Sequence, residues 1–217
     1  MSHPLARLLA AAADGQHLVA DGGWHRVPLW KEGLEAVLAF TGDAVLAVEQ
    51  DVPDRLLLQY GVDGFGGAHD PRLVAALAGA RGWIDSLDVL LARYGVGQGG
   101  VAMSLVDRPD LAAHPRAQFA AEIRDQPRIL GYQDRARSAV AIISRGVAGL
   151  PELSFELEQD RRGAGGGTAL VRDALRAVPT DQLLTAAVSP GNTASLRTLL
   201  STEFVPIASV QLFRRSG

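Results

Sequence analysis

A glycine-rich segment at residues 161–168 is the part of the sequence best suited to bind a phosphate group. It reads Arg-Arg-Gly-Ala-Gly-Gly-Gly-Thr and lies between a predicted strand and a predicted amphipathic helix. The N-terminus of a helix carries unpaired N–H groups and the positive end of the helix dipole. Glycines let this backbone close around phosphate oxygens, and the arginines can add charge-assisted contacts. The segment therefore predicts a diphosphate-binding loop, with a strand-to-helix turn that binds no ligand as the alternative.

A second glycine-rich segment, Gly-Val-Gly-Gln-Gly-Gly at residues 95–100, matches the G-x-G-x-x-G pattern of dinucleotide-binding folds. That interpretation requires a helix that opens at the glycines and an acidic residue at a strand end about 20 residues later. The sequence continues instead as VAMSLVDRPD, and Glu122, at a suitable distance, lies in a predicted helix. We therefore expect a flexible loop here rather than a dinucleotide site.

The periodicity of the apolar residues predicts the elements that hold the first loop. Residues 152–158 alternate between apolar and polar side chains, which indicates a strand, and residues 166–178 carry apolar side chains at helical spacing. Further predicted strands of this half cover residues 127–133, 138–146, 182–189 and 207–213, and further predicted helices cover residues 116–124 and 193–201. This order of elements is typical of a mixed α/β fold.

The first hundred residues predict an α/β extension that precedes this half. Its predicted helices cover residues 4–13, 51–59 and 71–77, its predicted hairpin covers residues 34–40 and 44–50, and a further strand covers residues 84–94. We expect an α/β (α+β) protein with a mixed central sheet flanked by helices. The expected division is an N-terminal extension at residues 1–100 and a second domain at residues 101–217.

The composition restricts the class of protein. The chain has 217 residues, of which 47% are hydrophobic and 21% charged, and its net charge is −3, which is typical of a globular protein and argues against a nucleic-acid partner. It has no cysteine, and its five histidines lack metal-pair spacing, so we expect neither disulfides nor a metal site. No apolar run has the length of a signal peptide or approaches the roughly 20 residues of a membrane span. We therefore expect a cytoplasmic protein without a membrane partner.

Two motifs in the C-terminal half resemble those of the GNAT family of N-acyltransferases. Arg162-Gly-Ala-Gly165-Gly-Gly167 matches the family signature R/Q-x-x-G-x-G/A between the fourth strand and its helix. Downstream, Asn192 stands where the family has an asparagine that opens the last helix, and Phe204 stands where a phenylalanine closes it. The resemblance covers roughly residues 127–213 and implies the GNAT fold with acetyl-CoA as co-substrate. It implies that the cofactor is held by Leu157, Arg162, Gly163, Ala164, Gly165, Gly166, Gly167, Thr168 and Asn192.

The sequence departs from the family pattern at two positions in the later motif. Leu199 stands where many members have a tyrosine that protonates the departing thiolate, and leucine cannot donate a proton. Tyr132 and Tyr94 are alternative acids from other elements. Glu203 stands where the family has a glycine, which predicts a different helix end. The resemblance therefore supports cofactor binding more strongly than it supports catalysis.

Acyl transfer requires the amine to be neutral when it attacks, and this often needs a base. Glu152, Glu156 and Glu158 lie on one face of the predicted fourth strand, and the resemblance implies that a base can come from this strand. Glu156 is our candidate for the base. A solvated strand face is the alternative interpretation for all three glutamates.

The resemblance implies an enzyme that transfers an acetyl group from acetyl-CoA directly to an amine of a small molecule or a protein. Two alternatives remain open at this point. The chain can be a GNAT-like sensor or regulatory module that binds acyl-CoA without catalysis, or a relic of the fold whose loop binds nothing. The N-terminal extension is expected to shape the acceptor pocket or to form a subunit interface, as in a homodimer.

Overall fold

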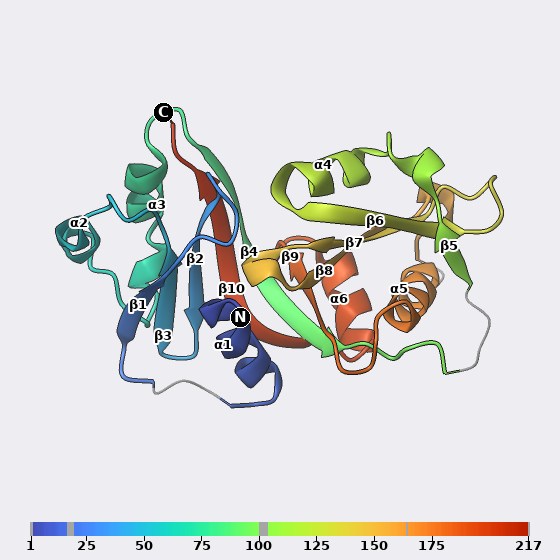
Figure 1. The fold of residues 1–217 in the computed structure, drawn as a ribbon, viewed down its shortest axis with the longest axis horizontal. Coiled ribbons are helices and arrows are strands. Elements are labelled where there is room, and N and C mark those ends of the chain that lie inside the picture. The colour runs from blue at the N-terminus through green and yellow to red at the C-terminus, as the bar shows by residue number, and fades with distance from the viewer. Residues whose placement is uncertain (1, 17–19, 100–103, 164, 217) are drawn as a thin grey trace. The chain divides into compact units, whose positions relative to one another are not determined.

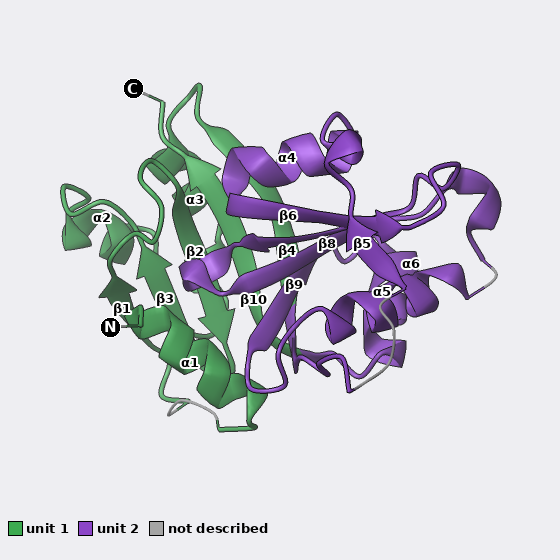
Figure 2. Cartoon of the chain, turned by 45° about the vertical axis from the view of Figure 1, so that its right-hand side comes forward, with its two compact units in different colours: residues 1–90, 206–217 green, residues 91–205 purple. Residues whose placement is uncertain are grey.

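A computed structural model describes residues 2–16, 20–99, 104–163 and 165–216 of the chain. The chain divides into two compact units, unit 1 with residues 1–90 and 206–217 and unit 2 with residues 91–205 (Figures 1 and 2). Strand β4 (Trp83–Tyr94) begins in unit 1 and ends in unit 2, whereas β10 (Val205–Arg214) lies almost entirely in unit 1. Relative to the expected division at residue 100, unit 1 gains the C-terminal strand and unit 2 gains residues 91–100.

Unit 1 combines mixed strand pairing with short helices. Besides the parts of β4 and β10, its elements are α1 (Pro4–Ala13), β1 (Gly23–Val27), β2 (Glu35–Phe40), β3 (Asp43–Ala47), α2 (Asp54–Gln59) and α3 (Pro71–Ala78). Strands β2 and β3 form the predicted antiparallel hairpin, β3 pairs in parallel with β1, and β2 pairs antiparallel with β10. Apolar side chains of β2, β3, α2 and α3 form the core of this unit together with Phe213 of β10.

Unit 2 contains the elements that position the two sequence motifs. They are β5 (Leu105–Asp107), α4 (Pro115–Ile123), β6 (Asp125–Tyr132), β7 (Val140–Arg145), β8 (Pro151–Glu156), α5 (Gly166–Arg176), β9 (Leu183–Val188) and α6 (Thr193–Ser201). Strands β5 to β8 pair antiparallel in succession, and β8 pairs in parallel with β9. Helix α4 lies on one side of β6, β7 and β8, and α5 and α6 lie on the other (Figure 1). The predicted mixed α/β fold is thus confirmed.

The differences from the predicted elements are small and have local causes. The sequence does not predict β5, because its three residues include one buried side chain, Leu105. Helix α5 ends at Arg176 rather than Val178, and Pro179 follows, a residue that cannot donate a helical hydrogen bond. Helix α2 begins at Asp54, directly after Pro53, rather than at residue 51.

Strand β8 is covered on both faces, unlike a strand at a protein surface. Its apolar face includes the buried Leu153, as the alternation predicts. The opposite face is polar, yet Glu152 and Ser154 are only 3% and 7% exposed, because α4 packs against this face. The alternative of a solvated strand face is therefore wrong for the inner part of β8.

Candidate cofactor-binding site

An open cavity of about 760 Å³ lies in unit 2 at the end of β8. Its walls come from the end of β8, the loop before α5, one side of α6 and the start of α4. Of the predicted site residues, its lining includes Glu156, Leu157, Arg162, Gly163, Gly165, Gly167, Thr168 and Asn192. Small-molecule sites typically have volumes of about 300–1,000 Å³, so the cavity has the size of a ligand site.

The loop before α5 leaves the N-terminus of that helix open. Gly163 and Gly165 have φ angles of 87° and 78°, a left-handed conformation that side chains rarely adopt. Gly165 is the N-cap residue of α5, and no side chain caps the helix, whose first turn contains no acidic residue. The first N–H groups of a helix have no partner within it, so those of α5 remain available to an anion. Ala164, also a predicted contact, lies outside the described residues.

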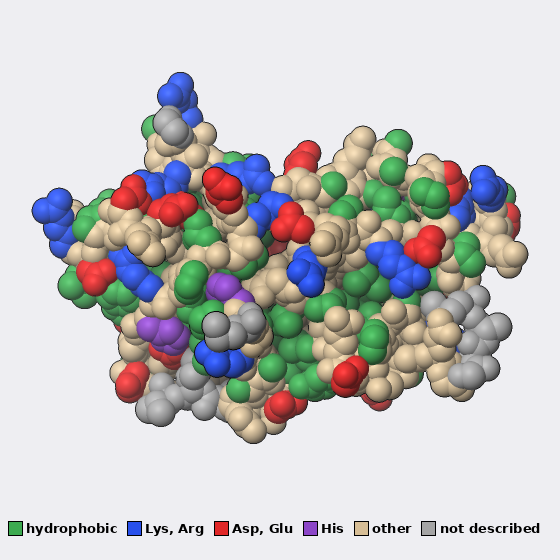
Figure 3. Space-filling model, viewed as in Figure 1, with side chains coloured by type: hydrophobic (Ala, Val, Ile, Leu, Met, Phe, Trp, Pro, Cys, Tyr) green, Lys and Arg blue, Asp and Glu red, His purple; other side chains and the backbone are tan. Residues whose placement is uncertain are grey.

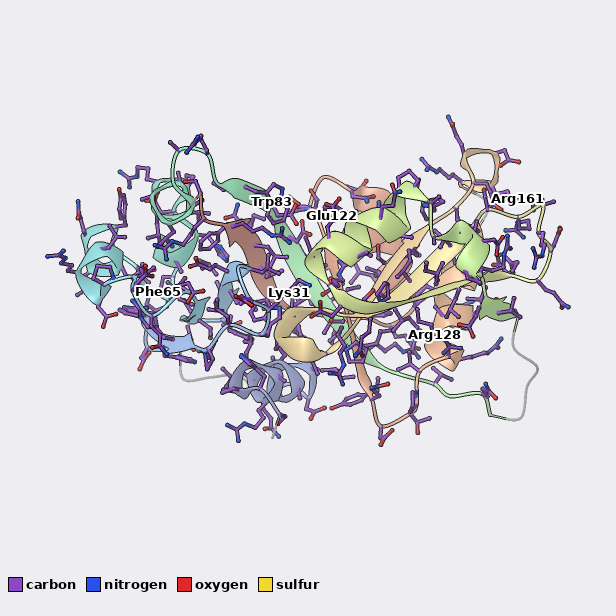
Figure 4. All side chains as sticks on the ribbon, turned by 45° about the horizontal axis from the view of Figure 1, so that its top comes forward. Lys31, Phe65, Trp83, Glu122, Arg128 and Arg161 are labelled. Carbon is purple, nitrogen blue, oxygen red and sulfur yellow. The ribbon has the colours of Figure 1, made fainter. Side chains whose placement is uncertain are left out.

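At the next two glycines an added Cβ atom would lie close to a neighbouring atom, and neither has a left-handed backbone. A Cβ atom at Gly167 would lie 3.2 Å from Thr198 Oγ1, where α5 approaches α6. At Gly166 it would lie 3.2 Å from the carbonyl oxygen of Arg161. Gly166 is not among the lining residues of the cavity, and Arg161 lies on the outer turn of the loop (Figure 4). The motif therefore combines residues that shape the loop with residues that hold the helix in place.

Asn192 opens α6, as the resemblance predicts. Its side-chain Oδ1 accepts a hydrogen bond of 3.2 Å from the N–H of Ser195, and the residue is the N-cap of the helix. Asparagine is among the residues most favoured at this position, because its side chain satisfies a helix donor. Asn192 also lines the cavity. The structure thus gives this side chain a role in the helix itself.

The other end of α6 has the geometry that the family's glycine would provide. Glu203 adopts a φ angle of 63°, its N–H donates to the carbonyl of Leu200, and the N–H of Phe204 donates to that of Leu199. These two bonds define a Schellman ending, which usually has glycine in the left-handed position. The expectation of a different helix end is therefore wrong. Leu199 is fully buried, so its side chain belongs to the core.

In the lining of the cavity, Glu156 lies between two arginines from different elements. Arg162 Nη2 donates to Glu156 Oε1 at 3.3 Å, and Arg116 Nε of α4 lies 3.6 Å from Glu156 Oε2. The side chain of Glu156 is 34% exposed and that of Arg162 59% exposed. All three residues line the cavity. The candidate base is therefore the centre of a partly exposed ion-pair cluster.

Glu152 of β8 and Glu158, two residues after its end, form tighter pairs that do not line the cavity. Glu152 accepts from Arg124 Nη2 and from the N–H of Val147, and the two charged side chains are more than nine-tenths buried. Glu158 accepts from Arg137 Nε at 2.7 Å. Burial raises the pKa of Glu158, but the hydrogen bonds from Arg137 and from backbone N–H groups outweigh it and lower the pKa to about 2. These two carboxylates are therefore committed to structural contacts.

The motifs do not predict the contribution of Arg116 and Arg124. Their eight-residue separation corresponds to about 12 Å along a helix. The four-residue separation of Glu156 and Glu152 corresponds to about 13 Å along a strand. The two arginines are thus about as far apart along the helix as the two glutamates are along the strand. This match between opposite charges could have indicated that α4 lies along β8.

Tyr132 and Tyr94, the alternative acids, lie outside the cavity lining. The guanidinium of Arg137 lies 4.2 Å from the centroid of the Tyr132 ring. Burial raises the pKa of the Tyr132 hydroxyl, and the charge of Asp173 raises it further, against a lowering by Arg137. His114 is the N-cap of α4, where its Nδ1 accepts from the N–H of Arg116. Neither side chain is among the residues that line the cavity, and neither is Tyr94.

The second glycine-rich segment is held by backbone hydrogen bonds in its described part. The N–H groups of Gly95, Val96 and Gly97 donate to the carbonyls of Gln182, Leu175 and Val178. No helix opens within residues 95–99, and residues 100–103 lie outside the described part of the chain. The described backbone therefore agrees with a loop and not with a dinucleotide fingerprint, although its first residues are tied to the end of α5.

Within the described residues, no helix is long and apolar enough to cross a membrane, and no three acidic or histidine side chains are grouped to hold a metal ion. On the face in view in Figure 3, acidic and basic side chains are intermixed. The cavity of unit 2 is the site at which residues of both sequence motifs come together.

Comparison with known proteins gives similarity at the level of structure. No family model matches the chain, and no curated protein matches its sequence. An acetyltransferase of the GNAT family from Novosphingobium aromaticivorans is 18% identical with a TM-score of 0.40, over 64% of this chain and 69% of that protein. A GCN5-related N-acetyltransferase from Kribbella flavida is 13% identical with a TM-score of 0.41, over 68% of this chain and 63% of that protein.

A third similar structure is a GNAT-family acetyltransferase from Colwellia psychrerythraea, 11% identical with a TM-score of 0.39. The match covers 62% of this chain and 57% of that protein. These three structures belong to the family that the two motifs resemble.

Proposed function

We propose that the chain is a coenzyme A-dependent N-acyltransferase that uses acetyl-CoA and transfers the acetyl group directly to an amine. The observation that carries this proposal is the uncapped N-terminus of α5, which opens through Gly163 and Gly165 onto a cavity at the end of β8. A helix N-terminus free of side-chain caps binds phosphate groups through its N–H donors and its dipole. The acceptor is an amine of a small molecule or of a protein.

The lining fits the parts of coenzyme A. The first N–H groups of α5 and the guanidinium of Arg162 would hold the diphosphate. Strand β8 pairs with β9 at Glu152 and Thr185, near the start of both strands, whereas the cavity lies at the far end of β8. Backbone groups near Leu157 would therefore be available to pair with an extended pantetheine arm.

Acetyl-CoA supplies an activated thioester, and the chain's own residues must bind it, orient it and manage the protons. Among the described residues that line the cavity, Glu156 is the carboxylate, and it remains the candidate to accept the proton that the amine loses. The lining also offers the hydroxyl groups of Thr168, Ser195, Thr198 and Ser201. A hydroxyl or a water held there would return a proton to the thiolate.

A sensor or regulatory module that binds acyl-CoA without catalysis is the second candidate. One observation favours it: Leu199 is fully buried, and the described lining residues include neither tyrosine nor histidine. Calorimetric titration with acetyl-CoA tests both candidates together, because absence of binding at millimolar ligand contradicts both. Release of free thiol in the presence of a panel of amines then separates them, since a sensor releases none.

Gly165 provides a direct test of the loop, with a matched control in the same unit. Gly165 and Gly149 have φ angles of 78° and 75°, and an added Cβ would meet nothing within 4 Å at either. Replacement by alanine should cost each variant about 1 kcal/mol of stability through backbone strain. Only Gly165→Ala, which reshapes the anion-binding backbone, should also weaken acetyl-CoA binding in calorimetry. Equal affinities in the two variants would show that the wrong loop has been chosen.

A further inference from the structure

The cluster around Glu156 places a negative charge inside the cavity proposed to bind a polyanion. Each carboxylate oxygen of Glu156 faces one guanidinium group, Oε1 that of Arg162 and Oε2 that of Arg116. Arg197 of α6 lines the same cavity. These arginines are the charged groups of the lining around Glu156, one from α4, one from the loop and one from α6.

Of the three glutamates in and just after β8, Glu156 makes the longest and most exposed contacts with arginine. Glu152–Arg124 is more than nine-tenths buried, and Glu158–Arg137 is joined at 2.7 Å with side chains 12% and 21% exposed. The contacts of Glu156 are longer, 3.3 Å and 3.6 Å, and its partners are 59% and 39% exposed. Exposed pairs at such distances contribute little to stability, so a stronger anion can replace the carboxylate.

We propose that Glu156 is an internal competitor for the diphosphate, which occupies Arg162 and Arg116 until the ligand's phosphate groups take Arg162 over. This inference rests on the proposed function, because it concerns the same cavity. In the empty site the carboxylate neutralises the arginines. When the ligand binds, Arg162 turns from Glu156 to phosphate, and the carboxylate is left with Arg116.

The exchange has consequences for affinity and for the order of binding. Displacing Glu156 lowers the affinity of every anion by the same factor, so tight binding requires a ligand with further contacts, such as a diphosphate that also engages the N–H groups of α5. The exchange also releases one side of the Glu156 carboxylate only after the cofactor has bound. The candidate base therefore becomes available to the amine in the ternary complex.

The test is a calorimetric comparison of the full-length chain with its variant Glu156→Gln, using coenzyme A and inorganic pyrophosphate as separate ligands. Removing the competing charge should tighten both ligands about 2- to 5-fold, the size expected for loss of a partly exposed ion pair. Asp160→Asn is the matched control, because it removes the same charge from an exposed residue that is not among the cavity lining. It should change either affinity by less than about 2-fold.

A conservative variant at the same position supplies a second readout. Glu156→Asp, which withdraws the carboxylate by one methylene, should tighten binding less than Glu156→Gln and serves if the latter does not fold.

The outcomes separate this inference from the proposed function. If Glu156→Gln binds both ligands more weakly or with unchanged affinity, Glu156 positions the arginines or is passive, and the inference is overturned. If pyrophosphate binds more tightly to the variant but coenzyme A binds to neither protein, the competition stands and the proposed function fails. If neither ligand binds the wild type or its variants, both fail.

Discussion

The two ends of β8 use the same chemistry for opposite purposes. At its start, Glu152 and Arg124 are buried together under the end of α4, and Glu152 also holds the N–H of Val147. At its other end, Glu156 contacts two partly exposed arginines in the lining of a cavity. A buried pair is costly to break, whereas an exposed pair contributes little to stability and can change partners. The comparison separates charges that hold the fold from charges that are available to a ligand.

The largest effect is expected from breaking the buried pair. Arg124→Ala should lower the free energy of unfolding by about 3–5 kcal/mol, because it leaves Glu152 buried without its cation. Urea denaturation followed by circular dichroism measures this loss. A loss below about 1 kcal/mol would show that water reaches this end of β8, and the contrast between the two ends would disappear.

A variant of Glu158 tests whether a carboxylate just past the end of β8 also stabilises the fold. Glu158→Gln should cost about 1.5–3 kcal/mol at neutral pH, since it weakens charged hydrogen bonds from Arg137 and a backbone N–H. The folded-state pKa of Glu158 is lowered from 4.5 to about 2, so its stabilisation is present above pH 4.5 and is lost as the pH falls toward 2. Unfolding curves of the two proteins should therefore converge in acid, and a constant difference would contradict this assignment.

Variants of Asn192 test whether the start of α6 mainly stabilises the fold or mainly binds the ligand. If its side chain serves the helix, Asn192→Ala should cost about 1 kcal/mol, whereas Asn192→Asp, which keeps the capping oxygen, should cost little. Thermal unfolding of the two variants provides the measurement. If alanine is tolerated but cofactor affinity falls, the asparagine serves the ligand instead.

The smallest effect on stability is expected at the open end. Arg162→Ala should change the free energy of unfolding by no more than about 0.5 kcal/mol, because its pair with Glu156 is exposed. It should nevertheless weaken coenzyme A binding about 10-fold, through the loss of a charge-assisted contact. Denaturation and calorimetry on the same sample give both numbers. A large stability loss with unchanged affinity would reverse the comparison.

Much of unit 2 could be predicted from the sequence because its elements have clear local signals. The alternation in residues 152–158 and the helical spacing after residue 166 located β8 and α5. The place of Asn192 located the first turn of α6. The exposure of β8 could not be predicted in this way, because alternation shows two faces but does not show that α4 covers the polar one.

The end of α6 shows a limit of reasoning from residue preferences. Glutamate is disfavoured in the left-handed conformation, so Glu203 argued against a Schellman ending. The structure has that ending nonetheless, with Leu199 and Phe204 both buried beside it. Burial of these two side chains and the ion pair of Glu203 with Arg93 offset the unfavourable φ angle.

By itself, the sequence determined the local backbone features of this protein. These are the left-handed glycines at residues 163 and 165, the uncapped start of α5 and the capped start of α6. Such features depend on residues within one turn of each other, so their physical causes are visible in a short stretch of sequence. Only the tertiary structure decided that Arg116 and Arg124 meet Glu156 and Glu152, and that residues 206–217 belong to unit 1. These contacts join segments far apart in the chain, and they depend on how a helix packs over a strand and on which strands pair.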